Sequence, residues 1–81
     1  MSNKLMLSIG FGNFVVKGEV RAIIQPNSAP VRRFIKQKFN DGKVIDATMG
    51  KKLRAVVILS SDHIVLSGIS VSSLITRSED G

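Results

Sequence analysis

Cysteine, tryptophan and tyrosine are absent from this 81-residue chain, and histidine occurs once. The absence of cysteine excludes disulfide bonds and thiolate metal sites, and one histidine provides no second imidazole for a common transition-metal site. His63 follows Asp62 in a turn-like segment, so we interpret it as a turn residue with a local hydrogen bond. We therefore expect no metal, no cofactor and no small-molecule ligand.

Long hydrophobic runs are also absent. The longest, Ala55 to Leu59, is far shorter than the roughly 20 residues that cross a bilayer. The apolar start, MSNKLMLSIG, is short and lacks the small-residue ending of a cleavable signal peptide. Because a lack of cysteine also suits a reducing compartment, we expect a cytoplasmic protein with no membrane partner.

Groups for catalysis are few, since the chain offers no obvious nucleophile with a base and no pair of poised carboxylates. The GKK run at 50–52 resembles the end of a P-loop, but that motif requires glycine where Ile45 stands and serine or threonine where Lys52 stands. The GxG at 10–12 lacks the third glycine of a dinucleotide fingerprint, because Val15 occupies that place. We expect no enzyme.

Acidic residues are outnumbered, with twelve Lys and Arg against six Asp and Glu and a net charge of +6. The segment 32–54 contains two acidic residues, Asp41 and Asp46, and accounts for the whole excess. Its basic residues are Arg32, Arg33, Lys36, Lys38, Lys43, Lys51, Lys52 and Arg54. Such a concentration is typical of a protein that binds a polyanion, although a merely solvated surface is the alternative.

Hydrophobic patterning predicts a small single α+β domain over residues 1–78, with residues 79–81 as a frayed tail. The expected strands are 4–9, 14–16, 20–25, 44–48, 53–60 and 64–66, in a mainly antiparallel sheet. One central amphipathic helix follows the PNSAP signal, in which Asn27 or Ser28 caps the helix and Pro30 lies in its first turn. Gly42 ends that helix, and 70–77 forms a short C-terminal helix.

The central helix is expected to turn an apolar stripe inward, formed by Val31, Phe34, Ile35 and Phe39. Lys38 falls near the middle of that stripe, so its stem must extend out to solvent or meet a partner subunit. The strand AVVIL at 55–59 is apolar on both faces. The helix can cover one face, and a neighbouring subunit is our candidate for the other.

The stretch GFGNFV at 10–15 is close to an RNA-recognition strand, but Ile9 replaces a basic residue and Asn13 is inserted, which sends later side chains to the opposite face. Single-strand binders stack bases on exposed aromatics, and the chain has only four, all phenylalanine. A duplex binder needs Lys and Arg at the spacing of phosphates instead. The turn GKKLR, with Lys51 and Lys52 at its tip, supplies such groups, although a soluble hairpin tip is the alternative.

Four separated stretches, IGFGN (9–13), SAP (28–30), IDAT-GKKLRAVVI (45–58) and SDHIVLS (61–67), together resemble the RemA family of bacterial extracellular-matrix regulators. The resemblance covers roughly residues 4–68. It implies a DNA-binding, nucleoid-associated transcriptional regulator of biofilm-matrix genes that works as a ring-shaped homo-oligomer. Its partners would be double-stranded DNA and further copies of itself, with weak basic contacts repeated around the ring.

The resemblance also assigns residues. The turn after the IDAT-like strand carries an arginine pair important for DNA in the family, and Lys51 and Lys52 stand there; lysine keeps the charge without the bidentate fork of arginine. A third family arginine matches Glu19, a reversal of sign. If that surface is retained, Glu19 repels phosphates; otherwise it pairs with Lys17 or Arg21 and faces away. The predicted DNA-binding residues are Lys51, Lys52, Arg54, Arg21, Lys17, Arg32, Arg33 and Lys36. A self-assembling ring with weak or no DNA binding is the alternative.

Overall fold

The computed structural model describes residues 5–79 of the chain, which form a small α+β domain. In chain order the strands and helices are β1 (Met6–Gly10), β2 (Asn13–Val16), the 3-10 turn η1 (Lys17–Glu19), β3 (Val20–Ile24), α1 (Ala29–Asn40), β4 (Val44–Asp46), β5 (Ala55–Leu59), β6 (Ile64–Ser67) and α2 (Val71–Glu79). This order confirms the predicted fold class. The C-terminal helix runs past its predicted end at Arg77, and Asp80 and Gly81 of the expected tail lie outside the described residues.

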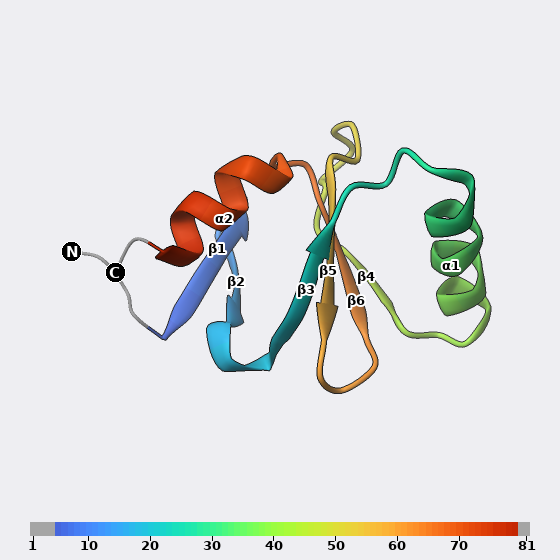
Figure 1. Cartoon of the computed structure of the whole chain (residues 1–81), viewed down its shortest axis with the longest axis horizontal. Coiled ribbons are helices and arrows are strands. Elements are labelled where there is room, and N and C mark those ends of the chain that lie inside the picture. The colour runs from blue at the N-terminus through green and yellow to red at the C-terminus, as the bar shows by residue number, and fades with distance from the viewer. Residues whose placement is uncertain (1–4, 80–81) are drawn as a thin grey trace.

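The strands form two sheets. β1 and β2 make an antiparallel hairpin, and the other four strands lie in the order β3-β5-β6-β4, in which only the β4–β6 pair is parallel. Figure 1 shows the hairpin and α2 at one end of the molecule and α1 at the other, with the four-stranded sheet between them. The prediction of a mainly antiparallel sheet is therefore confirmed.

Strand β5 is covered on both faces within the chain. Ala55 and Val57 pack in a cluster with Leu7 of the hairpin and Leu74 of α2, all at most 1% exposed. Val56 points the other way, into a second cluster with Ile35 of α1. The expectation that a neighbouring subunit covers the second face of β5 is wrong, because the first and last elements of the chain meet over it. Sequence periodicity does not reveal so distant a contact.

The ends of α1 follow the sequence signals. Ser28 is the N-cap, where its Oγ accepts a hydrogen bond from the Val31 N–H at 3.3 Å, and Pro30 lies in the first turn. At the other end Gly42 has φ +70°, a conformation that glycine adopts without steric cost, and its N–H donates to the Phe39 carbonyl. These local contacts set where the helix begins and ends.

The predicted inward stripe of α1 is correct except at its end. Ile35 is buried, and Val31 and Phe34 pack beside it, but Phe39 is 55% exposed, so its assignment to the core is wrong. Each four-residue step turns about 40° in an α-helix, so Phe39 has rotated roughly 80° from Val31. It therefore lies on the flank of the helix, outside the stripe.

Lys38 finds its partner inside the chain. Its Nζ lies 2.6 Å from Asp62 Oδ1 in the β5–β6 turn and 5.5 Å from the centre of the Phe34 ring. The side chain is only 12% exposed, so its stem is buried against the apolar stripe while its charge is neutralised at the edge. This contact replaces the partner subunit that the sequence suggested.

The GFGN segment is the β1–β2 turn. Gly10, Phe11 and Gly12 have φ of +105°, +55° and +78°, and the Asn13 side-chain amide donates to the Gly10 carbonyl at 3.2 Å. The pairing register shifts between Ser8 and Gly10, as the glycines predicted.

Within residues 5–79 no helix is long and apolar enough to cross a membrane.

Candidate nucleic-acid interface

The predicted basic turn lies in the connection between β4 and β5, residues 47–54. A tight turn closes it, in which the Lys51 N–H donates to the Thr48 carbonyl at 2.9 Å. Met49 and Gly50 occupy the two central positions with φ of +52° and +81°, the pattern of the hairpin-type turn that favours glycine. The geometry presents Lys51 directly after the turn and Lys52 next to it.

Hydrogen bonds hold both ends of this loop. Asp46 Oδ1 accepts from the Thr48 N–H at 2.9 Å and from the Thr48 hydroxyl at 2.7 Å, and these bonds hold the pKa of the Asp46 carboxyl below its ordinary value. At the other end the Arg54 N–H donates to the carbonyl of Ser67 in β6 at 2.9 Å. Both ends of the loop are thus fixed to the rest of the domain, so its cations start from ordered backbone positions.

Lys51, Lys52 and Arg54 are all exposed. Between residues 5–79 the ion pair that forms is Lys38 with Asp62, so none of these three charges is neutralised by a described carboxylate. Lys52 and Arg54 also line a shallow hollow of about 240 Å³ with the segment 25–27 and the start of α2. In Figure 1 this loop rises at one edge of the molecule, beside the first turn of α2.

The other predicted DNA-binding residues lie elsewhere. Arg32, Arg33 and Lys36 are exposed on α1. Lys17 lies in η1 and Arg21 in β3, where the register pairs Val20 with Leu59. Since Leu59 ends β5 and Arg54 precedes its first residue, Lys17 and Arg21 lie at the opposite end of that strand from the loop. One subunit therefore presents three separate basic groups, not one continuous stripe.

Glu19 does not lie beside the basic loop. Its carboxylate accepts a hydrogen bond from the Ser60 hydroxyl, and its carbonyl accepts from the Ser60 N–H at 2.7 Å. The 3-10 turn at 17–19 interrupts the strand alternation, and Glu19 forms no ion pair with Lys17 or Arg21. The expected pairing with Lys17 or Arg21 is therefore replaced by a contact with Ser60 in the β5–β6 turn, and the repulsion of phosphates by Glu19 stays a prediction.

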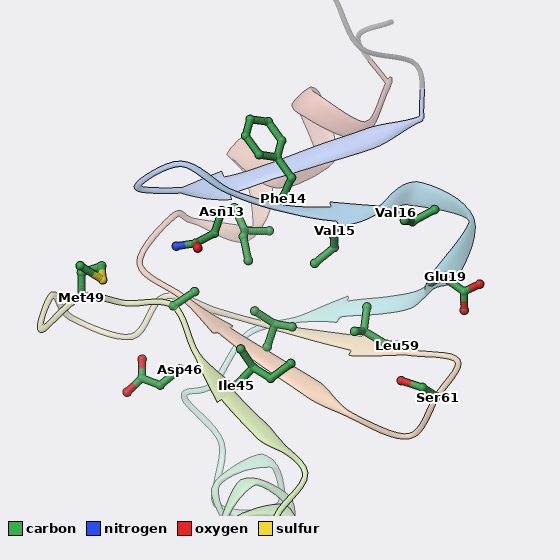
Figure 2. A pocket seen from close by; sticks show the side chains of 13 residues that line it. Asn13, Phe14, Val15, Val16, Glu19, Ile45, Asp46, Met49, Leu59 and Ser61 are labelled. Carbon is green, nitrogen blue, oxygen red and sulfur yellow. The ribbon is translucent and has the colours of Figure 1, made fainter.

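Sequence reasoning did not find the cleft between the β1–β2 hairpin and the four-stranded sheet, which measures about 550 Å³ (Figure 2). Its walls are mainly apolar and come from β1, β2, β4, β5, β6 and the basic loop. Its lining residues are Ile9, Asn13, Phe14, Val15, Val16, Glu19, Ile45, Asp46, Ala47, Met49, Leu59, Ser61 and Val65. No pattern in the sequence marked this cleft, because its walls come from strands that are distant from one another in the chain.

The single histidine matches its prediction as a turn residue. His63 Nδ1 lies 3.0 Å from the Ser61 hydroxyl, in the turn that joins β5 to β6. Among residues 5–79, no three His, Cys, Asp or Glu side chains gather closely enough to hold a metal ion.

Comparison with known proteins decides the family. The model of the RemA-like family, described as extracellular matrix regulatory protein A-like, matches residues 6–77. The chain belongs to the RemA-like family. A relative from Dictyoglomus turgidum, named "Putative regulatory protein", is 46% identical over 76 residues, which cover 94% of this chain and 89% of the relative.

Other relatives carry similar names. One from Thermoanaerobacter sp. X514 is 46% identical over 77 residues (95% of this chain, 79% of the relative), and one from Halothermothrix orenii is 44% identical over 78 residues (94% and 93%). The matches span the basic loop, the hairpin and both helices. A RemA-like chain with relatives named in this way has a regulatory role.

Proposed function

We propose that this RemA-like protein is a transcriptional regulator, without catalytic activity, that binds duplex DNA as a homo-oligomeric ring. The observation that supports this most is the basic loop, whose exposed Lys51, Lys52 and Arg54 have no described carboxylate partner. Phosphate contacts require cations held at fixed positions, and the hydrogen bonds of Asp46 and Arg54 supply that order. Genes for extracellular matrix are the proposed targets, from the description of the family.

Assembly suits this chemistry. One loop offers three cations, and three neutralised phosphates correspond to a log-log salt slope of about −2.7, since each contributes about −0.9. A ring repeats the loop, so that each further subunit binds at the high effective concentration set by its neighbours. Lysine at positions 51 and 52 contacts phosphates as a point charge, so binding depends strongly on salt and weakly on base sequence.

The experiment is a titration of fluorescent duplex DNA at several salt concentrations, with the wild type and Lys51→Glu/Lys52→Glu. The double substitution replaces two positive charges by two negative ones on an exposed turn, so we expect binding to be lost without a change in assembly mass. The matched control is Lys17→Glu/Arg21→Glu, which makes the same change in net charge at the far end of β5. The control should keep its affinity.

Equal losses in both variants would contradict a loop-specific site and indicate a general charge effect. Unchanged DNA binding in the loop variant would indicate that another basic group contacts the DNA. The largest such group is the one on α1, formed by Arg32, Arg33 and Lys36. In either case the salt slope still counts the phosphates that the wild type neutralises.

A second candidate is a self-assembling ring that has lost DNA binding. The observation that favours it is Glu19, which stands where the family resemblance expects an arginine and is engaged with Ser60. This candidate predicts an oligomeric mass by light scattering together with no DNA binding even at low salt. The proposed regulator instead predicts an oligomeric mass together with DNA binding.

A further inference from the structure

The cleft of Figure 2 leaves apolar surface in contact with solvent. Val15, Leu59 and Val65 line its interior, while Ile45 and Met49 at its mouth are 51% and 66% exposed. Figure 2 shows Val15 pointing from β2 into the space above Ile45. Exposed apolar surface that lines a concave site is characteristic of an interaction surface.

Two carboxylates flank this apolar surface. Figure 2 shows Asp46 toward one end of the cleft and Glu19 toward the other. The hydrogen bonds from Thr48 to Asp46 favour its charged form. An occupant that matches the cleft is therefore an apolar side chain with cations beside it.

The flank of α1 has this composition. Arg32, Lys36 and Phe39 are spaced i, i+4 and i+7, so they share one face of the helix. All three are exposed, Phe39 by 55% of its surface, and the sequence of α1, Ala29–Asn40, contains no acidic residue. The face is thus an exposed aromatic ring beside two cations, the complement of the cleft.

A single chain cannot join these two surfaces. The cleft is lined by Leu59 and Val65, whose side chains belong with the hairpin-side cluster, whereas α1 packs through Ile35 on the opposite face of the sheet. A contact between different surfaces of two identical chains is head-to-tail, and such contacts form a ring when the rotation closes. Because the cleft and the exposed face of α1 lie on opposite sides of the sheet, a contact between them joins two copies head to tail.

We propose that the Arg32–Lys36–Phe39 face of α1 in one copy docks in the cleft of the next copy, with Phe39 against Ile45 and Met49. This inference rests on the self-assembly half of the proposed function and names its contact. The aromatic ring supplies most of the affinity, because buried aromatic side chains dominate interfaces, and the ion pairs at the rim set the orientation. Arg32 and Lys36 then serve assembly rather than DNA.

The experiment uses the fact that a head-to-tail contact can be broken on either side. Phe39→Asp removes the helix face and Ile45→Asp removes the cleft, and both residues are half exposed, so neither substitution opens the core. Each variant alone should run as a monomer by light scattering after a sizing column. An equimolar mixture should give a dimer, since one intact face and one intact cleft remain.

The matched control is Phe11→Asp, which removes an equally exposed phenylalanine (57%) outside the cleft, at φ +55°, where aspartate is tolerated. It should assemble like the wild type. Should a variant fail to fold, a charge swap tests the rim ion pair that the proposal assigns to Lys36 of one copy and Glu19 of the next. Glu19→Lys or Lys36→Glu alone should lower the assembled fraction at least tenfold, and the two together in one chain should restore it.

The outcomes separate the two proposals. A monomeric wild type would overturn self-assembly and this contact together. An oligomeric wild type whose mass is unchanged by Phe39→Asp and Ile45→Asp would leave self-assembly standing and overturn the contact. Two monomeric variants that fail to dimerise when mixed would show that the two surfaces do not bind each other, which also overturns it.

Discussion

Replacing Leu74 by alanine should destabilise the domain severely, because this side chain is fully buried where α2 covers β5. Leu74 is 0% exposed and packs in one cluster with Leu7, Val57 and Val65. Truncating a buried leucine costs about 2–5 kcal/mol through lost burial and the cavity that remains. Since domains of this size are stable by about 5–15 kcal/mol in total, the loss is a large fraction of that margin.

The matched control is the next residue along α2. Ile75 is 42% exposed and belongs to no buried cluster, so Ile75→Ala should cost roughly 1 kcal/mol or less, in the ordinary range of substitutions near a surface. Both variants replace a branched aliphatic side chain by alanine in the same helix, and the helix propensities of leucine and isoleucine differ by only about a few tenths of a kcal/mol.

Thermal unfolding followed by circular dichroism measures the effect. For a domain of 60–100 residues, 1 kcal/mol shifts the midpoint by about 4–8 °C, so a loss of about 3 kcal/mol in Leu74→Ala lowers it by roughly 12–24 °C. The difference between the two variants should persist when the protein is diluted. Equal midpoints for the two variants would refute the conclusion that α2 covers β5. A difference in midpoint that vanishes on dilution would indicate that a neighbouring subunit, not α2 of the same chain, buries this face of β5.

Two further predictions concern carboxylates. The hydrogen bonds from Thr48 lower the pKa of the Asp46 carboxyl in the folded state. The stability that the Asp46 carboxylate contributes is therefore present above its unfolded-state pKa of about 3.9 and is lost as the pH falls through its folded-state pKa. Asp46→Asn should remove that part of the acid dependence in unfolding curves measured from neutral pH to pH 2. Glu19→Arg should reduce the oligomer mass, because Glu19 lines the cleft and accepts from Ser60. A tighter DNA complex with a steeper salt slope would instead place Glu19 on the DNA surface.

Local signals were the part of the fold that the sequence predicted well. Ser28, Pro30 and Gly42 set the ends of α1 through contacts within a few residues, and the glycines at 10 and 12 mark the hairpin turn for the same reason. Lys38 was anomalous in the stripe and proved to have a specific partner, Asp62, which is 24 residues away. The anomaly was visible in the sequence, but its partner was not.

Non-local packing could not be predicted in this way. Alternation showed that Ala55–Leu59 is apolar on both faces, yet nothing in a periodic pattern says which distant segment covers the second face, and the hairpin with α2 does so. The cleft is missed for the same reason, since its walls come from strands spread over most of the chain. The basic loop was predicted because its charges lie close together in the sequence, whereas its separation from Lys17 and Arg21 depends on the register of β3 with β5.

The meeting of β1 and α2 over β5 also has a kinetic consequence. Ser67 Oγ donates to the Ile9 carbonyl and Arg77 to the Ser8 carbonyl, across 58 and 69 residues of chain. The cluster of Ile35, Val56 and Ile64 needs only segments that follow one another closely. Because closing long loops slows folding, we expect the α1 half to form first and the hairpin half to close last. Pulse-labelled hydrogen exchange should then protect β5–β6 amides before those of β1–β2, and for that interval the apolar surface of Val57 and Val65 is open to aggregation.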